Sequence, residues 1–229
     1  MLEDLNSAKN KLITSISSIE LANYVAFQCN NFFPDNKKII THHLIDYVKN
    51  VLDKIEFCFQ HVKLEYYNKN NHPFFNHLNG DHYCIFLSYL TRYIYVKSEN
   101  INLASKIFLL NKSLHGIDSF YGISLPDIFI VCHPIGTVLG NAQYNDKMIF
   151  YQNVTVGSTS KGIFPKFSTE TILYSNSSVI GDCRIGKNVI IGANSSVINL
   201  DVQDDSVVLG NYPNNRIIKS KKQINQIFR

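Results

Sequence analysis

The sequence lacks any long uncharged apolar segment. None of its apolar runs approaches the roughly 18 residues that a helix needs to cross a bilayer. The first eleven residues include two acidic side chains and no apolar core, so we do not expect a signal peptide there. The sequence therefore predicts a protein with no transmembrane segment.

Cysteine is sparse and follows no recognisable pattern. The five cysteines are scattered, odd in number and free of Cys-X-X-Cys spacing: Cys29, Cys58, Cys84, Cys132 and Cys183. This arrangement argues against a disulfide framework and against a zinc knot. It predicts reduced thiols in a cytoplasmic protein.

The chain has little excess of charge of either sign. A net charge of +4, from 22 basic and 18 acidic residues, is too small to indicate a nucleic-acid partner. Hydrophobic residues make up 45% of the chain, which is too many for intrinsic disorder. A length of 229 residues suits one large domain or two small ones.

Glycine is almost absent from the first half. Of 11 glycines, only Gly80 precedes residue 113. Because glycine destabilises helix interiors and favours tight turns, the two halves should differ in structural class. Apolar residues recur at helical spacing in the first half, with Thr41 as a plausible N-cap. They predict helices within residues 5–25, 41–57, 81–96 and 103–114, and a loop around 67–73.

The second half contains a repeat of six residues. Five aliphatic residues follow one another at this spacing: Leu173, Val179, Ile185, Ile191 and Val197. A weaker run precedes them: Val138, Tyr144, Phe150 and Val156. A period of six fits a parallel β-helix whose stacked coils share one apolar core. An ordinary β-sandwich with accidental spacing is the alternative.

Several segments of the second half together resemble the hexapeptide-repeat acyltransferases, and among them the serine O-acetyltransferases. The resemblance covers residues 118–218. It rests on His133-Pro-Ile-Gly-Thr-Val-Leu-Gly, Tyr151-Gln-Asn-Val-Thr-Val-Gly, Pro165-Lys166, Ile185-Gly-Lys-Asn-Val-Ile-Ile-Gly-Ala193 and Gly210-Asn-Tyr-Pro213. It implies a left-handed parallel β-helix, acetyl-CoA as donor without a metal, and a homotrimer or dimer of trimers. We expect an α-helical domain over 1–114, the β-helix over 115–212 and a basic tail over 213–229.

The resemblance assigns the catalytic residues. The family's general base is a histidine at the start of the segment that begins here at His133, and a neutral imidazole can accept a proton near neutral pH. Asp118 lies 15 residues upstream, where the family places the aspartate that orients the histidine. From the residues alone, His133 reads as a packed or surface histidine and Asp118 as a solvated turn residue.

The acceptor site departs from the family's serine enzymes. Those enzymes have an aspartate where this chain has Cys132, and Arg-His where it has Ile163-Phe164. A free serine carboxylate would lose its arginine partner, so we expect a sugar or glycan-precursor hydroxyl as acceptor instead. The expected acceptor-binding residues are Cys132, Tyr151, Phe164 and Lys166. We interpret Cys132 as a structural or pocket residue rather than a nucleophile.

Donor binding is expected along the coils and in the tail. The segment that begins at Gly157 corresponds to the family's loop near the coenzyme arm, and Ala193 occupies a small-residue position beside the pantetheine. Basic residues of the tail can meet the phosphates of CoA, although a solvated terminus is the alternative. The expected cofactor-binding residues are Gly157, Ser158, Thr159, Ser175, Ala193, Arg216 and Lys219.

Other functions remain open at this stage. A metal-dependent β-helix enzyme would need several histidines, and beyond His115 the sequence offers only His133. An N-acetyltransferase acting on an amino sugar, a serine O-acetyltransferase and a degenerate structural β-helix are the alternatives to a sugar O-acetyltransferase.

Overall fold

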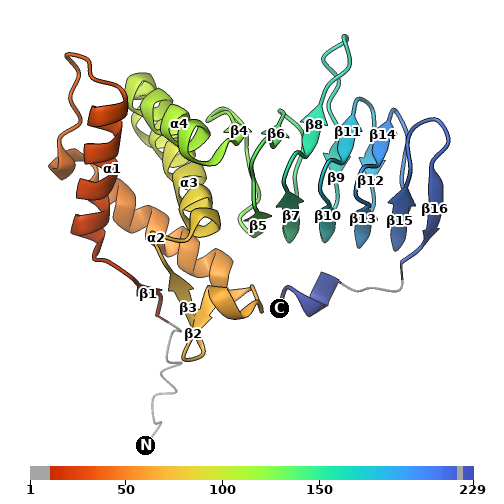
Figure 1. Cartoon of the computed structure of the whole chain (residues 1–229), viewed down its shortest axis with the longest axis horizontal. Helices are drawn as coiled ribbons and strands as arrows, with labels where there is room; N and C mark the ends of the chain where they lie inside the picture. The colour runs from red at the N-terminus through yellow and green to blue at the C-terminus, as the bar shows by residue number, and fades with distance from the viewer. Residues whose placement is uncertain (1–10, 221–223) are drawn as a thin grey trace, which may run out of the picture.

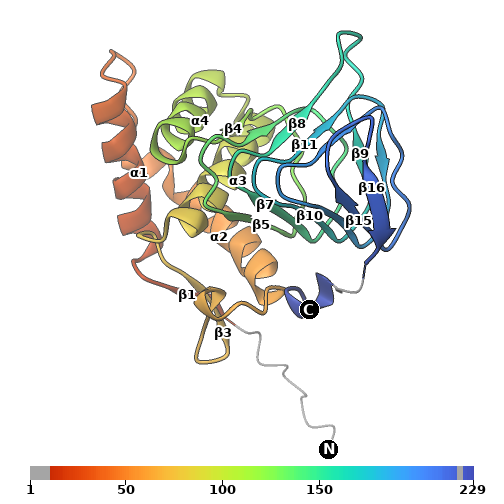
Figure 2. The same ribbon diagram turned by 45° about the vertical axis from the view of Figure 1, so that its right-hand side comes forward.

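The computed structural model describes residues 11–220 and 224–229. Its N-terminal part contains four α-helices, and a coil of short, mostly parallel strands follows (Figure 1). Figure 2 looks obliquely along this coil and shows its successive turns stacked on one another. The protein is thus a helical domain followed by a parallel β-helix of about five turns, which confirms the fold class that the repeat predicts and the left-handed β-helix family that the resemblance implies.

The helices begin at side chains that bind their free N–H groups. The helix bounds are α1 (Ser18–Phe32), α2 (Ile45–Gln60), α3 (Gly80–Ser98) and α4 (Ile101–His115). Ser17 and Glu20 form a reciprocal capping box at α1. Asn79 and Asn100 accept backbone hydrogen bonds at the starts of α3 and α4. These caps explain why α3 and α4 start within two residues of their predicted positions.

The first predicted helix starts later than its apolar pattern suggests. Leu5 lies outside the described residues, and Ile13 belongs to strand β1 (Ile13–Thr14). Thr41 is not the cap of α2. It begins the 3-10 turn η1 (Thr41–His43), and its hydroxyl donates to Asn23. The helix itself starts four residues later, at Ile45.

The predicted loop around residues 67–73 is a β-hairpin preceded by the short 3-10 turn η2 (Glu65–Tyr67). Strand β2 (Asn68–Lys69) pairs antiparallel with β3 (His72–Phe75), and β3 also pairs parallel with β1. The two turn residues, Asn70 and Asn71, both have positive φ, as a tight two-residue hairpin requires. The Asn-Asn pair is therefore a hairpin signal inside a polar stretch.

Three parallel sheets form the sides of the β-helix. One joins β5-β7-β10-β13-β15, another joins β4-β6-β8-β11-β14, and the third is β9-β12. The strand bounds are β4 (Asp118–Ser119), β5 (Phe129–Cys132), β6 (Val138–Leu139), β7 (Met148–Tyr151), β8 (Thr155–Gly157), β9 (Lys166–Phe167), β10 (Thr171–Leu173), β11 (Ser178–Ile180), β12 (Arg184–Ile185), β13 (Val189–Ile191), β14 (Ser196–Ile198) and β15 (Ser206–Leu209).

The six-residue repeat forms the core of the coil. All five members of the main run are buried: Leu173, Val179, Ile185, Ile191 and Val197. In the earlier run Val138 is 43% exposed, and its neighbour Leu139 is buried in register with Val156 instead. The phase of the repeat therefore shifts by one residue at β6.

Asparagines stack along one corner of the β-helix. Asn153 Nδ2 donates to Asn176 Oδ1 over 2.9 Å, and Asn176 Nδ2 donates to Asn194 Oδ1 over 3.0 Å. All three residues have φ between 55° and 58°, a left-handed conformation that asparagine tolerates better than most residues. The same residue type thus supplies both the sharp corner and a bond between coils.

The end of the chain folds back along the molecule. Strand β16 (Arg216–Lys219) pairs antiparallel with β15 at the far end of the β-helix. Residues 224–229 then lie beside the end of α2, where Phe228 is buried and forms a bridge with Val62 (Figure 1). Of the segment predicted as a tail, residues 216–219 therefore pack on the β-helix and residues 224–229 on the helical domain. Within the described residues, no helix combines the length and apolarity needed to span a membrane.

Candidate active site

A cavity of about 620 Å³ opens where the β-helix meets the start of α3. It contains three residues that the sequence singles out and four that it does not. The lining residues are Tyr66, Asn79, Gly80, Asp81, Cys132, His133 and Tyr151. The cavity therefore joins η2, the first turn of α3 and the ends of β5 and β7.

His133 occupies the corner directly after β5. Its φ of 53° is left-handed, and its side chain is exposed toward the cavity that it lines. Its backbone N–H donates to Asp81 Oδ1 over 3.1 Å, which ties the corner to the helical domain. The imidazole is thus accessible to a molecule in the cavity.

Asp81 brings a carboxylate into the cavity. Burial raises its pKa above the usual value, while the hydrogen bond from the His133 backbone opposes this rise. The Asn79 side chain accepts from the Asp81 N–H over 3.0 Å and so sets the first turn of α3. The sequence pattern shows Asp81 only as the first residue of a predicted helix, because nothing local reveals that it faces a residue of the β-helix.

Cys132 is buried between two tyrosines. Its thiol interacts with the hydroxyl groups of Tyr66 and Tyr151. Burial first, and then the charge of Asp81, raise the pKa of this thiol to about 11. A protonated thiol is a poor nucleophile at neutral pH. This environment favours the interpretation of Cys132 as part of the pocket wall.

Asp118 makes a different contact from the one predicted for it. Its Oδ2 atom lies 2.6 Å from Lys112 Nζ, at the last turn of α4. Among the described residues no hydrogen bond joins Asp118 to His133. In this chain Asp118 lies on β4, in register with Val138 of the next coil, and the pairing with Lys112 holds its carboxylate.

A row of residues continues from His133 along the same corner of the β-helix. The rings of Tyr151 and Tyr174 stack with centroids 4.9 Å apart. Beyond them, a largely apolar cavity of about 490 Å³ is lined by Tyr174, Gly192, Leu209 and Lys219, among others. Ser175 and Ala193 lie on neighbouring coils of this corner, where the Asn194 N–H donates to the Ser175 carbonyl. Tyr151, Ser175 and Ala193 thus follow one corner of the coil, whereas Lys219 lines the second cavity from β16, in register with Ser206 at the start of β15.

The remaining predicted residues lie outside both cavities. Gly157 ends β8 and leads into the loop with Ser158 and Thr159, which projects from the coil between β8 and β9 (Figure 1). Phe164 packs against Gly140, and Lys166 has an exposed side chain on β9. Arg216 lies on β16, in register with Leu209 of β15. Within one chain these residues are not brought to His133.

The parallel β-helix is the hexapeptide-repeat fold of the acyltransferases that the sequence resembles. Across the described ranges, no group of three or more His, Cys, Asp or Glu side chains is placed to hold a metal ion. No protein-family model matches the chain.

Known proteins similar to the chain are serine acetyltransferases. That of Synechococcus elongatus is 33% identical over 105 residues, which cover 44% of this chain and 43% of that protein. That of Staphylococcus xylosus is 28% identical over 145 residues, covering 62% and 66%. The chain therefore spans about half the length of the relatives it matches.

Solved structures of serine acetyltransferases share the fold. The Neisseria gonorrhoeae protein superposes with a TM-score of 0.67 at 20% identity, over 89% of this chain and 81% of that one. The Brucella abortus protein in complex with coenzyme A gives 0.68 at 16% identity, over 91% and 84%. These comparisons confirm the predicted resemblance and extend the structural similarity to the helical domain.

Proposed function

We propose that this chain is an acetyl-CoA-dependent O-acetyltransferase in which His133 is the general base. The observation that carries the proposal is the exposed imidazole at the end of the corner row, in a cavity that also contains the Asp81 carboxylate. The relatives named above support the same reaction class.

The reaction needs one proton acceptor and one aligned hydroxyl. A neutral His133 imidazole takes the proton of the acceptor hydroxyl as its oxygen attacks the thioester carbonyl carbon. The tetrahedral intermediate then expels the CoA sulfur, which leaves as the thiol with that proton. We still propose that Asp118 supports His133. Its carboxylate would either leave Lys112 and bind the imidazole of the same chain, or bind the His133 imidazole of a neighbouring subunit.

The donor is proposed to lie along the corner row. Gly192 lines the second cavity, Ala193 presents only a small side chain next to it in the sequence, and Lys219 supplies a cation at that cavity for a phosphate of CoA. Gly157, Ser158, Thr159 and Arg216 remain proposed donor contacts. The complex of the Brucella abortus relative with coenzyme A supports this choice of donor.

L-serine is the first candidate acceptor. The similar proteins are named for serine, and Asp81 offers a carboxylate to an acceptor ammonium group, a partner that sequence analysis did not identify. The replacement of an aspartate by Cys132 was one reason to expect that serine does not bind. Asp81 supplies a carboxylate in the same cavity, so this replacement does not exclude serine.

A neutral sugar hydroxyl is the second candidate. Ile163 and Phe164 stand where the family's serine enzymes carry Arg-His, and Ile163 is 42% exposed. An apolar pair cannot bind an amino-acid carboxylate, whereas the rings of Phe164 and Tyr151 can stack on a sugar. Lys161 and Lys166 flank this pair in the sequence and are the nearby cations that could replace the missing arginine.

The assembly is proposed to be a homotrimer or a dimer of trimers, in which Phe164 and Lys166 of one subunit approach His133 of another. We further propose a cytoplasmic location, because the five described cysteines are all free and buried, as suits a reducing compartment.

Thiol release from acetyl-CoA tests the proposal. Wild-type protein is assayed with L-serine and, separately, with neutral and amino sugars. His133→Asn is the informative variant, because asparagine tolerates the positive φ of this corner. Loss of a general base should lower kcat by about 10²–10⁴-fold.

Cys132→Ser is the matched control for the neighbouring position. It should retain turnover within roughly tenfold, since the proposed mechanism uses no cysteine nucleophile. Full activity of His133→Asn, or complete loss in Cys132→Ser with the fold intact, would contradict the assignment. Turnover of sugars with serine inert would replace the acceptor and leave the mechanism in place.

A further inference from the structure

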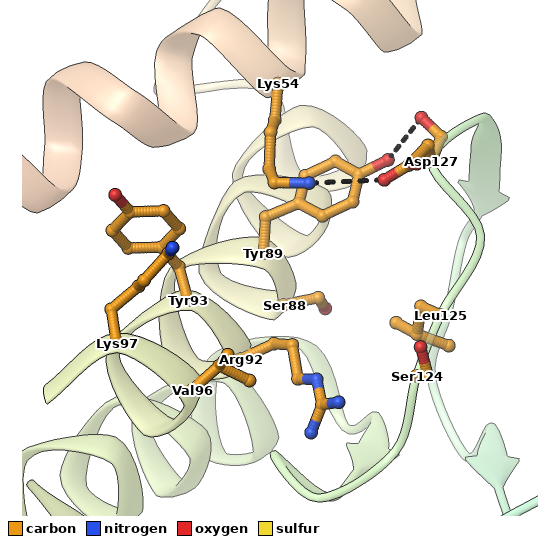
Figure 3. A pocket seen from close by; sticks show the side chains of 10 residues that line it. All are labelled: Lys54, Ser88, Tyr89, Arg92, Tyr93, Val96, Lys97, Ser124, Leu125 and Asp127. Atoms are coloured by element: carbon orange, nitrogen blue, oxygen red, sulfur yellow. Dashed lines mark hydrogen bonds and ion pairs between the residues drawn. The ribbon is translucent and has the colours of Figure 1, made fainter. Parts of the chain in front are cut away.

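A third cavity lies away from the candidate active site, between α2, α3 and the segment that leads into β5. This cavity has a volume of about 310 Å³, at the lower end of the range for small-molecule sites. Figure 3 shows its walls. The residues that matter for its chemistry are Lys54, Tyr89, Arg92, Tyr93, Lys97 and Leu125.

Three cations and one acid line the cavity. Lys54 Nζ lies 3.2 Å from Asp127 Oδ1, so this pair is neutral overall (Figure 3). Arg92 uses one guanidinium nitrogen, Nη1, to donate to the carbonyl groups of Tyr121 and Gly122, each over 3.2 Å. These neutral acceptors leave the Arg92 charge without an acidic counterpart.

Lys97 lies in the last turn of α3 and is exposed. Within residues 11–220 and 224–229, no carboxylate lies within ion-pair distance of Lys97 or Arg92. The cavity thus has two positive charges in excess. Partial enclosure reduces solvent screening, so a bound anion would interact with them more strongly than on an open surface.

Aromatic rings supply the apolar wall. The Tyr89 hydroxyl donates to the Asp127 carbonyl over 3.0 Å, which fixes its ring between α3 and the segment before β5. The Tyr93 ring makes an edge contact with Tyr47, with centroids 6.1 Å apart. Leu125 faces these rings from the opposite side (Figure 3). The cavity therefore offers flat apolar surface beside its cations.

We propose that this cavity binds a small aromatic anion, a single ring that carries a carboxylate or a phosphate group. The ring would lie against Tyr89, Tyr93 and Leu125, and the anionic group would meet Lys97, while Arg92 adds its positive charge from another side of the cavity. A ring with one phosphate group fits within 310 Å³, whereas a dinucleotide would not. The proposal does not depend on the function proposed for His133.

Phenyl phosphate is the probe, with benzoate as the carboxylate analogue and benzyl alcohol as the neutral control. Binding is measured by isothermal titration calorimetry at low salt on the full chain. We expect a Kd below about 1 mM for phenyl phosphate and no measurable binding of benzyl alcohol. Lys97→Gln should raise the Kd about five- to tenfold, and Lys97→Glu more, because a charge-assisted contact is lost.

Two further variants locate the ligand. Lys49→Gln removes an exposed cation from α2 outside the cavity and should leave the Kd unchanged. Lys219→Gln tests whether the anion binds instead at the proposed CoA-phosphate position. No saturable binding by wild-type protein, equal effects of Lys49→Gln and Lys97→Gln, or loss only in Lys219→Gln would each overturn the proposal. Tight binding of benzyl alcohol would show a merely apolar cavity and would also overturn it.

Discussion

Asp81 and His133 lie 52 residues apart in the sequence, and a single hydrogen bond joins them. Asp81→Asn keeps an oxygen that can accept from the His133 N–H but removes the negative charge. If this charge binds an acceptor ammonium group, the KM for L-serine should rise about 10- to 100-fold, as loss of a charge-assisted hydrogen bond predicts.

The KM for acetyl-CoA is the internal control for Asp81→Asn. It should not change, because most of the proposed CoA contacts lie along the coils beyond Tyr174, away from Asp81. Steady-state kinetics with both substrates varied measure the two constants together. An unchanged KM for serine would remove Asp81 from the acceptor site.

His82 is fully buried and makes stability depend on pH. Its ring packs 4.5 Å from the Tyr67 ring, and its Nδ1 atom accepts from the Asn76 N–H. Burial lowers its pKa from 6.5 to about 4. The unfolded chain therefore binds a proton below pH 6.5 that the native chain does not bind until about pH 4, so stability falls as the pH falls through this window.

A shift of this size corresponds to about 3 kcal/mol of stability lost between pH 7 and pH 4. Burial also lowers the pKa of His115 to about 4, which adds to the loss in the same direction. Urea unfolding measured from pH 7 to pH 4.5 checks the slope. His82→Gln, whose amide oxygen can replace Nδ1 as acceptor, should flatten it, and a slope equal to that of wild type would count against this role.

At the scale of the elements, the asparagine corner joins successive coils of the β-helix. Asn176→Gly preserves the left-handed backbone at low strain and removes two side-chain hydrogen bonds. Asn176→Ala removes the same bonds and adds about 1 kcal/mol for the positive φ. We therefore expect stability to decrease from wild type to Asn176→Gly to Asn176→Ala, as measured by urea unfolding.

Asn31→Ala is a suitable control for the loss of an exposed asparagine, because Asn31 lies at the end of α1 and bonds only to the carbonyl of Phe27 in the preceding turn. It should change stability by less than about 0.5 kcal/mol. If the glycine variant proves less stable than the alanine variant, the backbone conformation is not what asparagine provides there.

At the scale of the whole molecule, apolar residues remain exposed beside the candidate site. Ile135 is 67% exposed two residues after His133, and Val138 is 43% exposed on β6. Burial of such a surface between copies would stabilise a closed oligomer. Sedimentation should give about 79 kDa, three times the 26.2 kDa of one chain, or a multiple of that mass.

Ile135→Arg should dissociate the trimer if this face forms the interface. Ile101→Arg is the comparison, because Ile101 is 59% exposed at the start of α4 in the helical domain. A stable and active wild-type monomer would contradict both the oligomer and a site shared between subunits.

Elements with strong local signals could be predicted with little loss. The helices α3 and α4 start within two residues of their expected positions, because capping asparagines and apolar periodicity act within a few residues. The local sequence did not reveal the structure at Thr41, which was predicted as a helix cap, or at Asn70-Asn71, which were predicted as loop residues. There a hydroxyl bonds to another helix, and a hairpin is completed by β1 from earlier in the chain.

The six-residue repeat already favours the β-helix over a β-sandwich, since the coils share a core only if every sixth position from Leu173 to Val197 is apolar. His133 was singled out by the resemblance to the acyltransferase family, since the residues alone indicate only a packed or surface histidine. The surroundings of that histidine could not be predicted. Asp81, Tyr66 and the Lys112 partner of Asp118 reach their places through packing of the helical domain on the first coil. Contacts between residues far apart in the chain leave no periodic trace in the sequence, because they depend on how the elements pack and not on local spacing.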